Sequence, residues 1–454
     1  MEGPAALMTT VREDQKQSAE RGRLTAPSLL YSEDERDLSA ALADLLARQA
    51  SAADVIARIE GQETYDSALW RTVAAEIGVA GLLIPEALGG AGASYRELAA
   101  AAEQFGASVA PIPYLGSAAA TAALLSAARS AAADAPPDAA DIDASQPLSG
   151  PAAAVRDAAL RGRSGSGSLS GSGAAAGGRP VSPAAGLLRQ LADGSVTAAI
   201  AVTATTRPGS PFPKAARVAG RDQAAGTVRL RGTIRGVADA LPADILLVPA
   251  DGVPSALYLV EAGAPGVHRT PLVSLDMTRQ LCDITLDDAP ARPVVVGQAA
   301  EAALAAGLSA GAAILAAEQL GLAQRCLDMT VAYVRERRQF ARPIGSFQAL
   351  RHRLADLWTA IALARAASRY AAACLASEDK DTPVAVALAK SACSDVAVLA
   401  AQECVQLHGG IGFTWEHPAH LYLKRAKAAS VAFGSPGAHR AALADLVDLP
   451  APDA

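Results

Sequence analysis

The sequence predicts an α+β protein in which two helical blocks flank one block of short strands. Leucines at helical spacing begin after Ser32, and the helical pattern continues to residue 130. Residues 185–297 carry short β-rich runs bounded by Gly, Pro and Asp, a pattern typical of a barrel or sandwich. Residues 298–446 return to long helical periodicities, which predict a four-helix bundle. Helices and strands in separate blocks indicate separate domains, because βαβ units would alternate them.

The composition favours large cores and excludes several functional classes. Of the 454 residues, 51% are hydrophobic and 4% aromatic, and the formal net charge is -6. We therefore expect no electrostatic binding of nucleic acid. The apolar run 304–322 is interrupted by glycine and contains Glu318, so it predicts a buried core helix and no membrane span. The 5 cysteines form no CxxC pair, and no apolar secretory segment is visible. These features predict reduced thiols, no metal site and a cytoplasmic location.

The N-terminal helical domain is predicted over residues 32–130, after an irregular polar tail at 1–31 that we expect to be disordered. Ser32 and Glu35 have the spacing of a capping box, so the first helix begins there. The further helices of this domain are predicted at residues 67–77, 95–105 and from 111 onward.

Residues 131–184 are predicted to be a flexible insertion, because Ala, Pro, Asp, Gly and Ser bury too little apolar surface to offset the ordering entropy. A tether that docks a partner or carrier protein is the alternative interpretation. The strands of the middle domain (185–297) are predicted at residues 196–202, 227–230, 245–248, 256–260 and 280–286. The C-terminal helices are predicted at residues 302–334, 348–376, 382–407 and 417–429, before a tail at 447–454.

Two segments of the C-terminal block combine basic, aromatic and glycine residues. Residues 333–348 read YVRERRQFARPIGSFQ, and residues 402–413 read QECVQLHGGIGF. Cations at a helix C-terminus are favoured by the helix dipole, so a solvated basic helix end explains the first segment by composition alone. Paired glycines let a backbone approach a phosphate closely, but a glycine helix cap also explains the second segment.

Together with the N-terminal runs 78–86, 89–92 and 103–106, these segments resemble the acyl-CoA dehydrogenase family over nearly the whole chain outside the tail and the insertion. The resemblance implies the fold of that family and bound FAD. It assigns cofactor contacts to Arg337, Phe340, Gln348, Gln406, Gly409, Gly410 and Ser435. Arg337 would meet the FAD diphosphate across a subunit interface, where a guanidinium fork suits two phosphates. Ala341 replaces the family's usual glycine, so a different local turn is expected.

The resemblance also implies chemistry for which this sequence lacks a base. In the family, the flavin takes a hydride from the acyl β-carbon while a carboxylate removes the α-proton. The two family positions for that carboxylate correspond to Phe433 and Gly311, and neither residue accepts a proton. We therefore predict no catalytic residue in this chain. The nearby carboxylates, for which we expect structural roles, are Glu318, Glu403 and Glu416.

The middle-domain motifs that line the flavin in the family are degenerate as well. They read TTRPGS at residues 205–210 and GVAD at residues 236–239, so the aromatic and hydroxyl side chains of the second motif are lost. His408, inside the glycine segment, is expected to pack in the loop and not to act as a base.

Three hypotheses remain open. The favoured one is a base-deficient subunit of a heteromeric acyl-CoA dehydrogenase, which lends Arg337 and Gln406 to FAD while a partner supplies the carboxylate. The others are a self-sufficient acyl-CoA dehydrogenase with a displaced base, and a related enzyme of specialised metabolism with redirected chemistry. The resemblance implies an acyl-CoA or acyl-carrier thioester as substrate and an electron-transfer flavoprotein as acceptor. It also implies a homo- or hetero-oligomer, as a dimer or tetramer.

Overall fold

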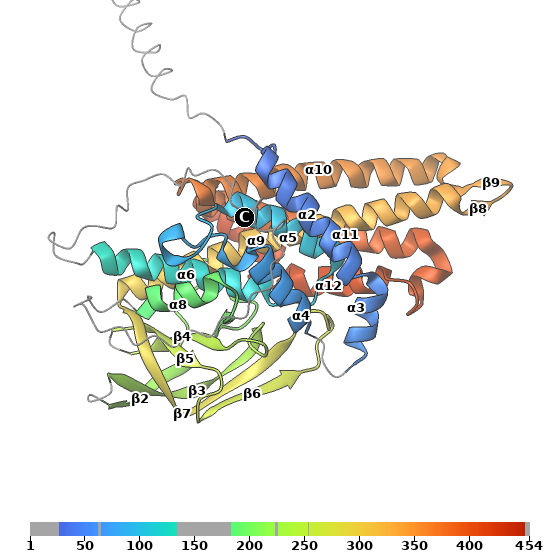
Figure 1. Ribbon diagram of the computed structural model, residues 1–454. Helices are drawn as coiled ribbons and strands as arrows, with labels where there is room; N and C mark the ends of the chain where they lie inside the picture. Colours follow the sequence, from blue (N-terminus) through green and yellow to red (C-terminus); the bar gives the residue numbers. More distant parts are fainter. Residues whose placement is uncertain (1–26, 62–64, 134–182, 223–225, 253, 450–454) are drawn as a thin grey trace, which may run out of the picture.

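The computed structural model describes residues 27–61, 65–133, 183–222, 226–252 and 254–449. A long C-terminal helical bundle and a smaller N-terminal helical domain lie together, and a β-domain packs below them (Figure 1). The predicted α+β class with separate helical and strand blocks is confirmed. The predicted tails and the low-complexity insertion lie outside the described residues, apart from 27–31, 131–133, 183–184 and 447–449.

The N-terminal domain begins at the predicted cap. The Ser32 hydroxyl accepts from the backbone N–H of Glu35, and the Glu35 carboxylate accepts from that of Ser32, which confirms the capping box. Just before it, Tyr31 lies under the Arg369 guanidinium at 3.6 Å, so the end of the predicted tail is attached to the bundle. The elements are α2 (Glu33–Gln49), α3 (Ala52–Ile59), α4 (Ser67–Arg71), η1 (Thr72–Glu76), η2 (Val79–Gly81), η3 (Glu86–Leu88), α5 (Tyr95–Ser108) and α6 (Tyr114–Ala133).

The β-domain is a 7-stranded sheet that closes on itself. β4 pairs with β2 and β5, and β2, β3, β7 and β5 then follow as neighbours, so these strands form a barrel. β1 extends the sheet beside β4, and β6 pairs with β7. The preceding helix α8 (Pro183–Ala192) packs on α6. The strands are β1 (Ala198–Ile200), β2 (Ala216–Asp222), β3 (Thr227–Ala238), β4 (Ile245–Asp251), β5 (Ala256–Glu261), β6 (Val267–Leu272) and β7 (Leu281–Val296).

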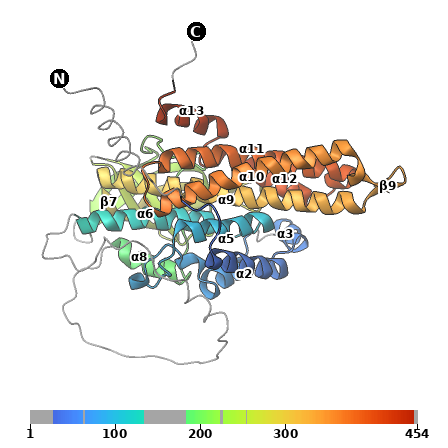
Figure 2. The same ribbon diagram turned by 90° about the horizontal axis from the view of Figure 1, so that it is seen from above.

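The C-terminal bundle contains α9 (Gln298–Glu336), α10 (Gln348–Ala376), α11 (Thr382–His408) and α12 (Ala419–Val431), with α13 (Pro436–Leu446) against α11 (Figure 2). At its far end lie β8 (Arg338–Gln339), β9 (Arg342–Pro343), η5 (Ile344–Ser346) and η6 (Gly409–Phe413). Helix α5 crosses α9 at very short range. Gly106 lies against the backbone of Glu318, and Gly321 against that of Glu103, so a side chain at either glycine would overlap a carbonyl group.

Among the described residues, two helical segments are long and apolar enough to cross a membrane by length and composition: Gln298–Glu336 and Thr382–Phe413. In the folded protein, 67% and 61% of their most apolar windows are buried. Both segments pack against other helices of the bundle, which accounts for their apolar character.

Candidate functional site

Most of the predicted cofactor residues lie at the far end of the bundle. Helix α9 ends, α10 begins and α11 ends there, so turns from distant parts of the sequence meet around the β8–β9 hairpin (Figure 2). The side chains or backbones exposed at this end belong to Arg337, Phe340, Gln348, Gln406, Gly409 and Gly410. Ser435 is separate from this group, because it caps α13 and its hydroxyl accepts from the backbone N–H of Ala438 at 3.3 Å.

The β8–β9 hairpin presents an aromatic side chain to solvent. Phe340 and Ala341 form its two-residue turn with φ of 51° and 62°, the left-handed pair that tight hairpins require. Ala341 therefore keeps the backbone conformation that glycine favours. Phe340 is 87% exposed. Arg342 lies over the Phe347 ring at 3.9 Å, which holds the base of the hairpin against the start of α10.

Arg337 and the glycine pair have the properties that a diphosphate needs. Arg337 is exposed beyond the end of α9 and makes no ion pair with any described residue. Gly409 ends α11 with φ 64°, as a helix-capping glycine does. At Gly409 and Gly410, no atom lies within 4 Å of where a Cβ would be, so the backbone is open to a ligand. An unpaired guanidinium beside an open glycine loop fits the phosphates of FAD.

His408 has a packing role. It is buried, and its ring stacks on Tyr333 with centroids 4.4 Å apart, while His417 lies 4.3 Å away on another side. Its Nδ1 lies 2.7 Å from the backbone oxygen of Cys404. The imidazole thus fixes the loop that carries Gly409 and Gly410.

The two positions at which the resemblance predicts the family's base, Gly311 and Phe433, lie in contact. A Cβ added at Gly311, on α9, would lie 2.6 Å from two atoms of the Phe433 ring. Phe433 lies between α12 and α13 with φ 52°, and its backbone N–H donates to Ala204 at 2.7 Å. The ring packs on all three apolar clusters that the helical domains and α8 form. A phenyl group therefore fills the point where both carboxylate positions converge.

The carboxylates proposed as substitutes are engaged elsewhere. Glu318 is buried and accepts from Arg279 at 2.5 Å and from Arg425 at 2.8 Å. Burial alone would raise the pKa of Glu318, but the two guanidinium groups lower it to about 2. Glu403 pairs with Arg353 at 2.7 Å, and Glu416 is exposed beyond η6. Glu318 and Glu403 thus make the ion pairs expected of structural groups.

The first degenerate motif of the β-domain contacts the Phe433 turn, defined here as residues 432–435, and Gly236 of the second motif accepts from the backbone N–H of Ala204 beside it. Gly236 has φ 61° and empty space where a Cβ would be. Asp239 is buried and accepts from the backbone N–H of Gly116 at 2.9 Å, and burial raises its pKa. Arg207 reaches the turn, since a Cβ at Gly434 would lie 2.8 Å from the Arg207 Cβ.

Sequence reasoning missed two residues that contact the Phe433 turn. His439, on α13, lies with Nε2 2.7 Å from the Phe433 carbonyl oxygen. Lys390, on α11, has its Nζ 3.4 Å from the Gly434 carbonyl oxygen. The only sequence signal for Lys390 was a single lysine in an alanine-rich helix, and periodicity alone does not distinguish such a lysine from a solvated one.

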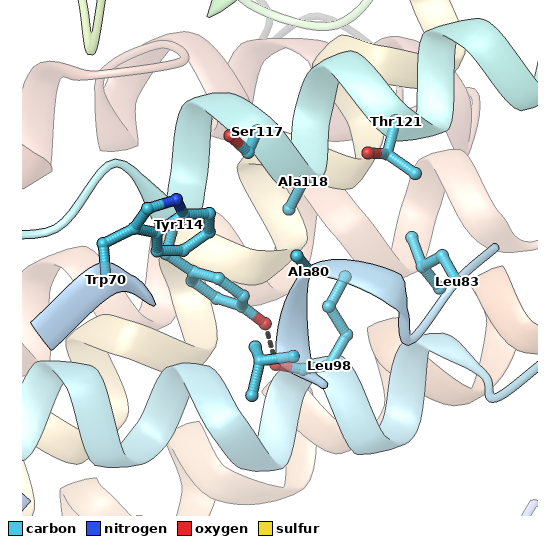
Figure 3. A pocket seen from close by; sticks show the side chains of 9 residues that line it. Trp70, Ala80, Leu83, Leu98, Tyr114, Ser117, Ala118 and Thr121 are labelled. Atoms are coloured by element: carbon cyan, nitrogen blue, oxygen red, sulfur yellow. Dashed lines mark hydrogen bonds between the residues drawn. The ribbon is translucent and has the colours of Figure 1, made fainter. Parts of the chain in front are cut away.

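A small pocket lies inside the N-terminal domain (Figure 3). Its Tyr114 hydroxyl donates to the Leu98 carbonyl at 2.7 Å, while the buried Trp70 Nε1 has no partner among the described residues. The lining residues are Trp70, Val79, Ala80, Leu83, Leu98, Tyr114, Ser117, Ala118 and Thr121. These walls offer hydroxyl groups but neither a carboxylate nor an imidazole, so they supply no base near neutral pH.

Comparison with known proteins identifies the family of the chain. The acyl-CoA dehydrogenase N-terminal domain family matches residues 32–134, and the C-terminal domain family matches residues 300–447. The chain is 31% identical to acyl-CoA dehydrogenase IpdE2 of Mycobacterium tuberculosis over 404 residues, which cover 89% of this chain and 94% of the relative.

Solved structures give the same result for the fold. The ChsE4-ChsE5 complex from Mycobacterium tuberculosis is similar with a TM-score of 0.70 and 25% identity, over 94% of this chain and 100% of that one. A Tcur3481-Tcur3483 steroid ACAD variant has a TM-score of 0.69 and 28% identity, over 92% of this chain and 98% of that one. The chain belongs to the acyl-CoA dehydrogenase family, whose members are FAD-binding oxidoreductases that act on CH–CH groups.

Proposed function

We propose that this chain is the base-deficient subunit of a heteromeric acyl-CoA dehydrogenase. The observation that carries the proposal is the contact between Phe433 and Gly311. The two positions where the family places its carboxylate fall together, and a phenyl ring occupies the space. Without a proton acceptor there, the α-carbon of a bound thioester keeps its proton.

In this account the chain completes a flavin site formed mainly by its partner. FAD supplies the hydride acceptor when it is bound. Arg337 provides a guanidinium fork for the diphosphate, and the open backbone of Gly409 and Gly410 provides N–H donors. Phe340 and Gln406 flank the same end of the bundle. The partner contributes the carboxylate that removes the α-proton.

Several relatives support an assembly of two different subunits. The ChsE4-ChsE5 and Tcur3481-Tcur3483 structures are each named as pairs of chains, and both match nearly the whole length of this one. We therefore propose a hetero-oligomer, as a dimer or tetramer, with an acyl-CoA or acyl-carrier thioester as substrate. An electron-transfer flavoprotein is the proposed acceptor, and the proposed location is cytoplasmic.

The proposal is tested by assaying the chain with and without its partner. The purified chain alone should form no 2,3-enoyl product from a panel of acyl thioesters in a dye-reduction assay. The chain co-purified with its partner should turn over. Turnover by the pure homo-oligomer would instead support a self-sufficient enzyme with a displaced base. A product other than the enoyl thioester would support redirected chemistry.

A further inference from the structure

Lys390 is a buried cation without a carboxylate partner. It lies in the middle of α11 with 0% of its surface exposed. Its Nζ donates to the Ser394 hydroxyl at 2.8 Å and to the carbonyl of Ala429 at 3.1 Å, with that of Gly434 at 3.4 Å. No carboxylate of the described residues lies within ion-pair distance of it. Lysine is rarely buried in this way, because removal of an ammonium group from water is costly.

The groups around Lys390 come from each neighbouring element. On α11 itself these are Cys393 and, farther off, Asp395. On α9, the neutral Gln319 accepts from the Ser394 hydroxyl at 3.1 Å. His439 on α13 and Arg207 of the β-domain face the same turn. Burial lowers the pKa of Lys390 to about 7, and Cys393 and Asp395 raise it only in part.

The Phe433 turn closes over this amine. Ala429 lies in the last turn of α12, and Gly434 directly follows Phe433, so the two carbonyl acceptors bracket the segment that carries the phenyl ring. Gly434 is itself buried. If the turn moved away, Lys390 would lose the Gly434 carbonyl group and meet water.

We infer that Lys390 is a positioning residue for the Phe433 turn: the turn seals a buried amine, so its displacement, and that of the phenyl ring, is coupled to proton uptake by Lys390. The coupled proton comes from water and ends on Nζ. Because the inference rests on the geometry around Lys390, it holds whichever subunit carries the catalytic carboxylate.

The sign of the coupling follows from linkage. With the turn closed, the pKa of Lys390 is about 7, whereas a solvated lysine has its ordinary value of 10.5. Below pH 7 both states are protonated, and the closed state carries the full cost of a buried charge. Between pH 7 and 10.5 the open state binds more protons, so each rise of one pH unit disfavours opening by about tenfold. The turn is therefore expected to open more readily toward acidic pH.

Hydrogen–deuterium exchange of the full chain tests this inference. We would follow peptides covering residues 428–438 between pH 6 and pH 9, and divide each rate by the intrinsic chemical rate. The equilibrium constant for opening of the wild-type turn should not change with pH below pH 7, and it should fall by about tenfold per pH unit above pH 7. In Lys390→Met this dependence should vanish. The control variant Lys427→Met removes an exposed lysine of α12 and should retain it.

With the turn closed, the two titratable neighbours His439 and Cys393 do not change charge between pH 7 and pH 9. Burial lowers the pKa of His439 below its usual range and raises that of Cys393 to about 12. The inference would be overturned if the equilibrium constant for opening of the wild-type turn did not change between pH 7 and pH 9. This measurement needs no variant. Persistence of the pH dependence in Lys390→Met would overturn it as well. Neither readout requires turnover, so failure here is distinct from failure of the proposed function.

Discussion

At the scale of single residues, the proposed lack of a catalytic base rests on the contact between Phe433 and Gly311. The two residues are far apart in the sequence, and each could be explained separately as a neutral replacement. The fold brings them to one point, where a ring atom would lie 2.6 Å from a Cβ at position 311. A carboxylate introduced at Gly311 alone would therefore meet the ring, so either family position can be restored only if Phe433 is removed.

Gly311→Ala should test this contact without any assay of activity. The added methyl group overlaps the Phe433 ring, so we expect a loss of about 1–3 kcal/mol in the free energy of unfolding. In a Phe433→Ala background the penalty should disappear. Gly186→Ala is the control, since no atom lies within 4 Å of a Cβ there and alanine should stabilise α8. Urea unfolding measures all of these variants, and an equal penalty in both backgrounds would contradict the contact.

Arg337 should be the strongest single contributor to FAD binding at the end of the bundle. In the assembled oligomer, Arg337→Ala should weaken FAD binding by about tenfold to a hundredfold, because a charge-assisted hydrogen bond contributes about 1.5–3 kcal/mol. Arg337→Lys should recover only part of the loss, since an ammonium cannot form the bidentate fork. Arg338→Ala is the neighbouring control. Titration of FAD fluorescence reports the affinities, and equal losses for both arginine variants would refute the assignment.

At the scale of elements, a buried ionic cluster joins the β-domain to the bundle. Arg425 on α12 donates to Glu318 on α9 and to Thr278, which follows β6, at 3.0 Å. Asp276 lies 3.3 Å from the same guanidinium, and Arg279 pairs with Glu318. Because these groups are buried and their charges pair with one another, removal of one charge leaves the others uncompensated.

Glu318→Gln should accordingly destabilise the protein by about 3–5 kcal/mol. The control Glu261→Gln, whose pair with Arg292 is exposed, should change stability by about 0–1 kcal/mol. The two arginines lower the pKa of Glu318 to about 2 from 4.5. Its contribution is thus fully present above pH 4.5 and lost as the pH falls toward 2. Denaturant midpoints measured from pH 2 to pH 7 should show a shallower acid loss in Glu318→Gln, and an unchanged slope would count against the cluster.

The sequence predicted the order and type of the blocks but not every element. The strands β2 and β6 and the helices α3, α8 and α13 lie outside the predicted ranges. β2 contains Arg, Gly and Asp and a bulge between Val218 and Gly220, and β6 is largely exposed, so neither carries the apolar alternation of a buried strand. β7 continues past its predicted end at residue 286, although two prolines lie within it at positions 290 and 293 and proline is disfavoured inside a strand. Tertiary pairing stabilises these strands where local preference does not.

The candidate site was predictable in a similarly uneven way. The exposed residues at the end of the bundle followed from two sequence segments and a resemblance. The other neighbours of Phe433 did not, because Ala204, Lys390 and His439 come from three separate parts of the chain. Such a site depends on packing between domains, which no local pattern encodes.

At the scale of the whole molecule, the exposed far end of the bundle contrasts with the packed interior around Phe433. The far end of the bundle exposes an arginine, an aromatic ring and an open glycine loop away from the chain's own β-domain (Figure 1). The interior turn that would carry a base is instead packed by Phe433 against three apolar clusters. This arrangement is the basis for the proposed division of labour between two subunits.

The most direct measurement is flavin reduction in the chain without any partner. The pure homo-oligomer, reconstituted with FAD and mixed anaerobically with a panel of acyl thioesters, should keep its oxidised visible spectrum. Addition of the partner subunit should allow bleaching of the flavin and formation of the 2,3-enoyl thioester. Bleaching in the homo-oligomer alone, with a matching amount of enoyl product, would contradict the account.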